Sequence, residues 1–331
     1  MITLNNIKEA KKNLENIAVN TPLAKAPILS KELNAEIFLK KENLQLTGSF
    51  KLRGAFNKVA TLSKKQKDNG VVAASAGNHA QGLAFAAQYF SCEATIFMPE
   101  ATPLTKVSGV KSYGAEVVLI GENFDEAYEA ATKFALENNK EFIHPFADDE
   151  VIAGQGTIAL EILEEIKDLD RIIVPIGGGG LISGIAIAAK AINPNIKITG
   201  VVASGAKGMK DSFESRMPID SVTVRTIADG IAVRDVTPKL LDIILEYVDE
   251  IVEVTDNETA NAILFLLEKH KLMVEGAGAV ATAALMHGKV DIENSKVCAI
   301  VSGGNIDVTM LSLIIEKGLV KSNRKMNLIV T

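Results

Sequence analysis

The stretch GSFKLRGA, residues 48–55, places a single lysine between small residues and a phenylalanine, at the edge of an apolar run. A lysine is usually a solvated surface charge. An amine in apolar surroundings can instead form a Schiff base with a carbonyl compound. We therefore interpret Lys51 as the attachment point of a carbonyl cofactor, provided that other parts of the chain supply a site around it.

Three glycine-containing stretches each follow a segment that we predict to be a buried strand. They are SAGN at 75–78 after strand 71–74, GGGG at 177–180 after strand 171–176, and SGGN at 302–305 after strand 296–301. In open α/β sheets, ligands bind beyond the carboxyl ends of the strands. A single glycine loop can be a mere turn requirement, but three such loops together with Lys51 predict one shared site.

Predicted strands alternate with predicted helices along most of the chain. The remaining predicted strands are 36–41, 94–98, 116–120, 142–143, 196–203 and 249–254. The predicted helices are 5–16, 50–63, 79–89, one starting near Pro103, 125–137, 153–166, 181–191, 207–215, 256–270 and 278–287. This alternation favours an α/β fold with more than one mostly parallel sheet flanked by helices.

Composition narrows the class of protein. The chain has 331 residues, of which 47% are hydrophobic, so it can form two domains with sizeable cores. No stretch approaches the ~20 apolar residues of a membrane span. The net charge of −6 lacks the excess of positive charge that is typical of nucleic-acid-binding proteins. Cys92 and Cys298 lie in different predicted elements, which favours reduced thiols and a cytoplasmic protein.

The four glycines at 177–180 have the chemistry of a phosphate cradle. Residues without Cβ let backbone N–H groups approach an oxyanion, and the following helix adds the positive end of its dipole. A Walker loop is excluded because no Gly-Lys-Ser/Thr follows. The dinucleotide pattern fails because its third glycine would fall at Ser183, and strand 196–203 ends without an acid. A monophosphate is the better ligand.

The polar residues of the other two loops each allow two interpretations. Asn78 can bond a ring hydroxyl or cap a helix, and His79 can face the site or pack in the interior. The backbone of Ser75–Gly77 can face a carboxylate at a helix N-terminus. Ser302 can form a hydrogen bond with a heterocycle nitrogen, or it can be a serine whose hydrogen bonds are made within a turn.

With these residues assembled, the sequence resembles the pyridoxal phosphate enzymes of the tryptophan synthase β fold type. It is most similar to their threonine dehydratase and serine racemase branch, over nearly the whole chain. The motifs that carry the resemblance are ENLQ (42–45), SFKLRGA (49–55), SAGNHAQG (75–82), AGQGT (153–157), GGGGL (177–181), ADG (228–230), EGAG (275–278) and SGGN (302–305).

The resemblance assigns roles to residues. It implies that Lys51 holds pyridoxal phosphate and that Phe50 packs against its ring. It implies that Asn78 bonds the ring 3-hydroxyl and that Ser302 bonds the pyridine nitrogen. The implied phosphate loop comprises Gly177, Gly178, Gly179, Gly180 and Leu181. The implied substrate contacts are Ser75, Ala76 and Gly77 on the carboxylate, with Asn78, His79 and Gly230 beside them.

The activity implied by this resemblance is the deamination of L-threonine to 2-oxobutanoate and ammonia, and of L-serine to pyruvate. Such an enzyme serves isoleucine biosynthesis or threonine catabolism. Serine racemase, a β-replacing enzyme of the same fold and a non-catalytic amino-acid-binding module are the alternatives. Racemases carry a serine where this chain has Ala76, and acidic metal ligands where it has the segment 202–208, which contains no carboxylate. Dehydration is therefore favoured, with no metal site.

The resemblance also predicts domains and assembly. Residues 1–53 and 147–322 are expected to form a large cofactor-binding domain, and 54–146 a small mobile domain that closes over the substrate. We expect residues 323–331 to hold a linker and the first strand of a truncated ACT-like regulatory domain. A homodimer or homotetramer is expected.

If Lys51 is the cofactor anchor, Lys51→Ala should abolish both the yellow colour of the bound cofactor and turnover. The physical reason is that the substituted side chain has no amine. Absorbance spectra and an assay for 2-oxo acid release test this expectation, and a yellow, active variant would contradict it.

Overall fold

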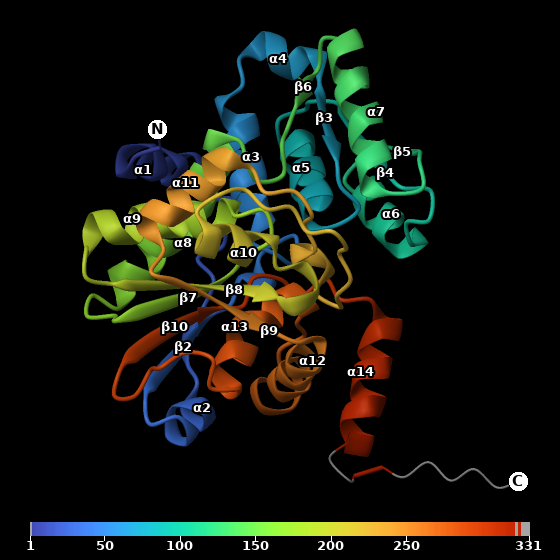
Figure 1. Ribbon diagram of the computed structural model, residues 1–331. Helices are drawn as coiled ribbons and strands as arrows, with labels where there is room; N and C mark the ends of the chain where they lie inside the picture. The colour runs from blue at the N-terminus through green and yellow to red at the C-terminus, as the bar shows by residue number, and fades with distance from the viewer. Residues whose placement is uncertain (1, 322–323, 326–331) are drawn as a thin grey trace, which may run out of the picture.

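Two β-sheets organise the chain in the computed structural model, which describes residues 2–321, 324 and 325 (Figure 1). The larger sheet has the strand order β1 (Leu23–Lys25), β2 (Glu36–Lys40), β10 (Lys296–Ile300), β7 (Arg171–Pro175), β8 (Lys197–Ala203) and β9 (Glu250–Val254). Only β1 runs antiparallel to its neighbour. The smaller sheet is wholly parallel, in the order β5 (Glu116–Leu119), β4 (Ala94–Met98), β3 (Val71–Ala74) and β6 (Glu141–Phe142). The predicted fold class is confirmed.

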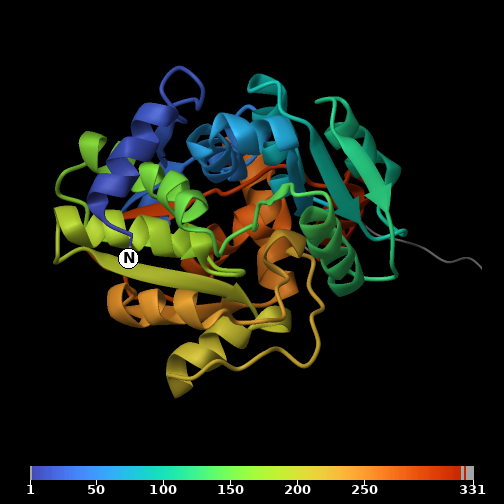
Figure 2. The same ribbon diagram turned by 90° about the horizontal axis from the view of Figure 1, so that it is seen from above.

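Helices cover both faces of the larger sheet (Figures 1 and 2). One face carries α1 (Leu4–Asn13), α8 (Asp149–Glu165), α9 (Gly180–Ile192) and α11 (Pro238–Tyr247). The other face carries α2 (Pro27–Glu32), α12 (Asp256–Phe265) and α13 (Gly276–Met286). A parallel sheet covered in this way has buried strands, which explains their continuous apolar sequences.

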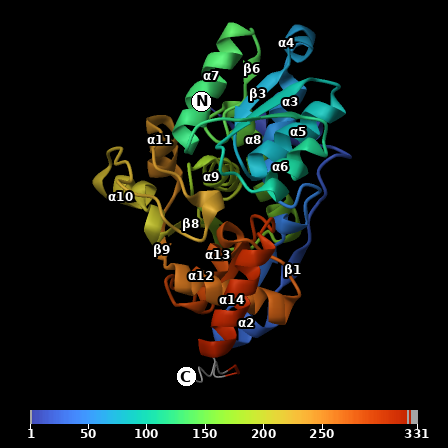
Figure 3. The same ribbon diagram turned by 90° about the vertical axis from the view of Figure 1, so that its right-hand side faces the viewer.

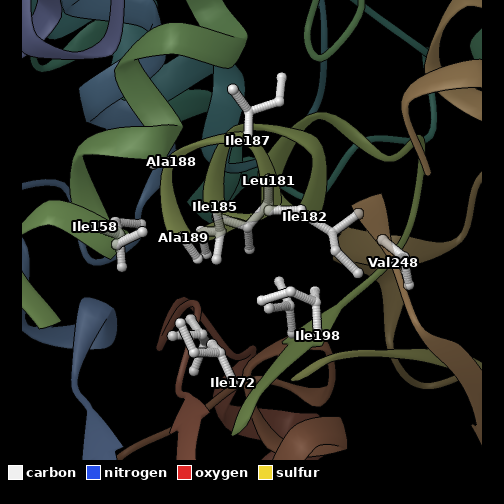
Figure 4. Close-up of a cluster of buried hydrophobic side chains, with 14 of the residues drawn as sticks. Ile158, Ile172, Leu181, Ile182, Ile185, Ile187, Ala188, Ala189, Ile198 and Val248 are labelled. Atoms are coloured by element: carbon white, nitrogen blue, oxygen red, sulfur yellow. The ribbon is translucent and has the colours of Figure 1, made fainter. Parts of the chain in front are cut away.

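Helix α9 lies at the centre of the first layer (Figure 4). Ile182 and Ile185 face Ile172 of β7 and Ile198 of β8, while Ile187 points the other way (Figure 4). Each such buried isoleucine stabilises the fold by about 1.5–3 kcal/mol. The glycine loop at the start of α9 is therefore attached to a rigid part of the core.

The smaller sheet lies beside the larger one and has its own core (Figures 1 and 3). Helices α3 (Lys51–Thr61), α5 (Asn78–Tyr89) and α6 (Leu104–Lys111) pack on one face, and α7 (Phe124–Glu137) packs on the other. The short helix α4 (Lys64–Asn69) leads into β3, and α10 (Gly208–Ser215) follows β8. The segment 54–146 predicted as a small domain thus contains all four strands of this sheet.

Several elements differ from the sequence-based expectations. Strand β1 and helices α2, α4 and α11 form where none was expected, and the helix expected over 256–270 continues beyond Phe265 as a π-helical turn, Leu266–His270. Helix α14 (Val308–Lys321), which lies beside α12 (Figure 3), also forms where no helix was expected. Helix α14 forms because Ile314 joins the core beneath it. Of the segment 323–331, only Arg324 and Lys325 are described, so the regulatory strand predicted within it lies outside the described residues.

Three features bear on the class of protein. Within residues 2–321, 324 and 325, no helix is long and apolar enough to cross a bilayer. The same part of the chain has no group of three or more histidine, cysteine or acidic side chains placed to hold a metal ion. Cys92 and Cys298 are free thiols, and both are buried.

A buried charge cluster joins α3 to the larger sheet. The Arg53 guanidinium donates to both oxygens of Glu42 at 2.8 and 2.9 Å, and to both oxygens of Glu161 at 2.5 and 2.9 Å. Lys40 contacts Glu161 at 2.6 Å. Burial by itself would raise the pKa of the Glu42 carboxyl, but Arg53 and the Thr21 hydroxyl hold it below its usual range. Because Arg53 lies two residues after Lys51, the cluster fixes the start of α3, where Lys51 stands.

Arg53→Met should lower the free energy of unfolding by about 3–5 kcal/mol, because it leaves the buried Glu42 carboxylate without its ion-pair partner and leaves Glu161 with Lys40 alone. Urea denaturation at pH 7 measures the change. Arg234→Met is the matched control, since Arg234 and its partner Asp125 are both about half exposed, at 53% and 54%, and such pairs contribute about 0–1 kcal/mol. Equal losses in the two variants would contradict the role of the cluster.

Candidate active site

All the residues that the sequence predicts for the site line one cavity of about 790 Å³. They are Phe50, Lys51, Ser75, Ala76, Gly77, Asn78, His79, Gly177, Gly178, Gly179, Gly180, Leu181, Gly230 and Ser302. They meet because β3, β7 and β10 end at the same side of the molecule. Their individual roles remain predictions, but their convergence is a property of the fold.

Lys51 is the first residue of α3 and projects its amine into this cavity. Its Nζ donates to the carbonyl oxygen of Pro145 at 2.8 Å and lies 5.4 Å from the centre of the Phe50 ring. Removal from water lowers the pKa of Lys51 to about 8, and the nearby Glu275 carboxyl opposes part of this shift. A substantial fraction of the amine is therefore neutral near physiological pH.

The glycine loop between β7 and α9 has the form of an anion cradle. Gly179 adopts a left-handed backbone with φ +96°, and a Cβ at Gly178 would lie 2.5 Å from the Phe146 ring. The first helical hydrogen bond is donated by Ser183 to Gly179 O at 3.0 Å. The N–H groups before Ser183 at this helix start are therefore the donors that an α-helix leaves free for an anion.

The loop after β3 departs in one respect from its predicted role. The backbone N–H of Ser75 donates to Phe97 O at 3.1 Å, because the β3–β4 hydrogen-bond ladder extends one residue past the strand. That N–H is not available to a substrate carboxylate. The Ser75 hydroxyl, which accepts from Gly77 N–H at 3.3 Å, and the N–H of Ala76 are the groups left to face it.

The two histidines at the cavity are neutral at pH 7. His79 is buried, and its Nε2 lies 3.0 Å from Ile143 O. Burial and the Lys51 charge lower the pKa of His79 to about 3, and they lower that of His144 to about 4. His144 Nδ1 accepts from the N–H groups of Phe146 and Ala147 at 3.3 and 3.0 Å. Lys51 therefore has no protonated histidine beside it to act as an acid.

Ser302 and Asn78 are both held by neighbouring groups. Ser302 Oγ donates to Ala277 O at 3.2 Å. Asn78 Nδ2 donates to Glu275 Oε1 at 2.6 Å, and Asn78 Oδ1 accepts from Asn305 Nδ2 at 2.8 Å. Glu275 is buried, and burial followed by repulsion from Asp229 raises its pKa to about 7.

Sequence reasoning gave no role to several residues of the cavity. Glu275 and Asn305 stand inside motifs that were recognised, EGAG and SGGN, so their motif positions were the available signal. Gln155 stands inside AGQGT, is buried, and its Oε1 has no partner among the described residues. Asp229 likewise stands inside ADG. Phe146 and Lys106 also line the cavity, and only their spatial neighbours reveal them.

The fold and the site together define a class: an α/β enzyme in which an interior lysine faces a glycine-lined anion cradle between two parallel sheets. Residues 14–303 match the family described as "Pyridoxal-phosphate dependent enzyme", and the chain belongs to this family. Its cofactor is pyridoxal phosphate. The cavity fits that group, because it offers an amine for the aldehyde, free helix-start N–H groups for the phosphate, and polar side chains for the ring.

Individual relatives cover almost the whole chain. L-threonine ammonia-lyase of Thermotoga maritima is 51% identical over 325 residues, which is 98% of this chain and 81% of that protein. The processed form of threonine deaminase isoform 2 from Solanum lycopersicum superimposes with a TM-score of 0.89 at 38% identity, over 95% of this chain and 86% of that one. Maize serine racemase has a TM-score of 0.91 at 34% identity, over 97% and 99%.

The lowered pKa of Lys51 predicts how the cofactor-free protein takes up pyridoxal phosphate. Only the neutral amine attacks an aldehyde, so the rate of attachment should rise with pH around a midpoint of about 8. Absorbance changes recorded between about pH 6 and 10 measure it. Glu275→Gln should move the midpoint to lower pH, because the carboxylate raises the Lys51 pKa. A midpoint of ~10.4, the value of a solvated lysine, would be the contrary result.

Proposed function

We propose that this protein is an L-threonine ammonia-lyase that also accepts L-serine. The observation that carries the proposal is the meeting of the Lys51 amine, the glycine cradle and the turn after β3 in one cavity. The 51% identity to an L-threonine ammonia-lyase over 98% of the chain supports the choice of reaction and substrate. The net reaction converts L-threonine to 2-oxobutanoate and ammonia.

Pyridoxal phosphate, when bound, withdraws electrons from the substrate and so makes the Cα–H bond acidic. The side chain that receives this proton is Lys51, whose Nζ is neutral to a useful extent because its pKa is about 8. Phe50 and the Gly177–Gly180 loop hold the cofactor's ring and phosphate.

The substrate is held through its carboxylate at the start of α5, by the Ala76 N–H and the Ser75 hydroxyl. Lys51 Nζ takes the Cα proton, and the β-hydroxyl takes up a proton as it leaves as water. Lys51 then gives up its extra proton, so that the net products are an enamine and one water. The released enamine becomes an imine, and the imine takes up water to give the 2-oxo acid and ammonia. The water lost in the first stage equals the water consumed in the second, so the reaction balances.

Serine racemase is the second candidate, because the maize enzyme shares this fold with a TM-score of 0.91. Racemisation needs a second acid or base on the opposite face of the substrate. In this chain the methyl group of Ala76 stands in the cavity at the position where racemases carry a serine. Residues 202–208 also supply no carboxylate for a metal ion. A β-replacing enzyme is less well supported, because those tend to carry Ser-Gly-Asn-Thr where this loop reads Ala76-Gly77-Asn78-His79.

We also propose that residues 54–146 move as a unit and close over the substrate. Two ion pairs join this segment to the loop that follows Ala228. Lys106 of α6 contacts Asp229 at 2.7 Å, and Asp125 of α7 contacts Arg234 at 3.1 Å. All four side chains line the cavity. Their charges are positioned to hold the two segments together when substrate is present.

We further propose that the protein is cytoplasmic and forms a homodimer or homotetramer. The two free, buried thiols agree with a reducing compartment. This chemistry serves a biosynthetic and a catabolic role alike.

The decisive assay is 2-oxo acid release from L-threonine and L-serine by protein whose absorbance has first been recorded. The expected result is yellow protein that forms 2-oxobutanoate and pyruvate, with D-serine formed no faster than without protein. Chiral chromatography measures D-serine. D-serine formed at a rate comparable to pyruvate would favour the racemase instead, and protein that stays colourless with added cofactor would contradict both.

Closure through exposed ion pairs should be sensitive to salt. Raising salt from ~0.05 to ~0.5 M should increase the KM for L-threonine a few-fold, because such pairs are screened. The double variant Lys106→Met/Arg234→Met should show a raised KM that no longer responds to salt. Lys64→Met is the control, since the Lys64–Asp68 pair is exposed and Lys64 does not line the cavity. Identical salt responses in the double variant and the control would refute the closure contacts.

A further inference from the structure

The side-chain amides of Asn78 and Asn305 form a continuous hydrogen-bonded relay across the cavity. Asn305 Nδ2 donates to Thr47 O and to Asn78 Oδ1, both at 2.8 Å. Asn78 Nδ2 then donates to Glu275 Oε1 at 2.6 Å. The relay therefore runs from the backbone before Lys51, through two amides, to a buried carboxyl on the far side.

The two ends of this relay determine the orientation of both amides. The Thr47 carbonyl is an acceptor only, and so is the Glu275 carboxyl in its ionised form, so each meets an amide nitrogen. Turning the Asn78 amide over would bring its oxygen against Glu275 and its nitrogen against the Asn305 nitrogen. Both Nδ2 hydrogens of Asn305 are used. One Nδ2 hydrogen of Asn78 is not, and Asn78 lines the cavity.

The Glu275 carboxyl fits beside Asn78 because two neighbouring positions of the chain are glycine. Glu275 is 4% exposed. A Cβ at Gly303 would overlap Glu275 Oε1 and lie 3.2 Å from Asn78 Nδ2. A Cβ at Gly230 would lie 3.6 Å from the same oxygen. Two glycines from different loops thus accommodate one carboxyl, and any side chain at 303 would break its contact with Asn78.

Glu275 is also the carboxyl that interacts with the Lys51 charge. The other charged groups that act on it are Asp229 and Lys106, which are paired with each other at 2.7 Å. Neither bonds the Asn78 amide, whose two side-chain partners are Glu275 and Asn305. Among the charged residues of the cavity, Glu275 is therefore the one that can control how Asn78 is oriented.

We propose that Glu275 is a positioning residue that acts through Asn78, holding its amide so that an N–H, and never the carbonyl, faces the cofactor. The ring of pyridoxal phosphate carries a hydroxyl beside its aldehyde, and in the deprotonated form this oxygen is an acceptor. A fixed N–H donor selects that form. A free amide would present its oxygen part of the time and bind the cofactor more weakly.

This inference rests on the cofactor of the family and not on the identity of the substrate. Its readout is the affinity of the cofactor-free protein for pyridoxal phosphate, measured by absorbance titration. A failed threonine assay therefore leaves it untouched, and its own failure leaves the proposed reaction in place.

The test compares Glu275→Gln with Glu275→Met, each made with Asn78 intact and in an Asn78→Ala background. Glutamine keeps an acceptor for the Asn78 N–H, whereas methionine has a similar size and lacks a strong acceptor. With Asn78 intact, Glu275→Met should weaken cofactor affinity about tenfold, a typical effect of losing one such bond. Glu275→Gln should stay within about threefold of the wild type. In the Asn78→Ala background, both substitutions should change the affinity less than about twofold.

Should Glu275→Met fail to fold, Asn305→Leu makes the same comparison, because it removes the bond on the other side of the Asn78 amide. Equal losses of affinity with and without Asn78 would overturn the proposal, since Glu275 would then act by another route. Equal losses from the glutamine and methionine variants would overturn it as well, because the acceptor would not matter. An unchanged affinity in Glu275→Met would do the same.

Discussion

The guanidinium of Arg53 is 1% exposed, and a charge so far from water is stable only when its hydrogen bonds are all made. Glu42 and Glu161 provide them from a turn after β2 and from α8. These bonds fix the start of α3 against the larger sheet, while the rest of α3 packs on the smaller one. Lys51, two residues earlier, is therefore held at the boundary between the two sheets, where a cavity opens.

That cavity exists because parallel strands bring their carboxyl ends to one side. Strands β7 and β10 of the larger sheet and β3 of the smaller one deliver the glycine loop, Ser302 and Asn78 to the same space. Close packing then explains which residues must be glycine. Gly178 leaves room for the Phe146 ring, and Gly303 leaves room for the Glu275 carboxyl. The glycines in these loops therefore make room for neighbouring side chains as well as for a ligand.

The chemistry of the site follows from its poor access to water. Burial lowers the pKa of Lys51 to about 8, which makes a base of an amine that is otherwise charged at pH 7. The same burial keeps His79 and His144 neutral and raises the pKa of Glu275 to about 7. The site therefore combines one reactive amine with two neutral histidines, which suits removal of a proton by Lys51.

The sequence by itself determined the α/β class and most helix and strand positions, because hydrophobic periodicity is a local signal. Its glycine-rich strand ends, and the family motifs around them, located part of the cavity lining. It missed α2, α4, α11 and α14, since these short or peripheral helices depend on a surface to pack against. It also predicted that the backbone of Ser75–Gly77 faces a carboxylate, and it could not show that the neighbouring strand uses the Ser75 N–H. Only the tertiary structure decided that Glu275 bonds Asn78, 197 positions away in the chain. Such contacts arise from the approach of distant loops, and nothing in the local pattern of either residue encodes its partner.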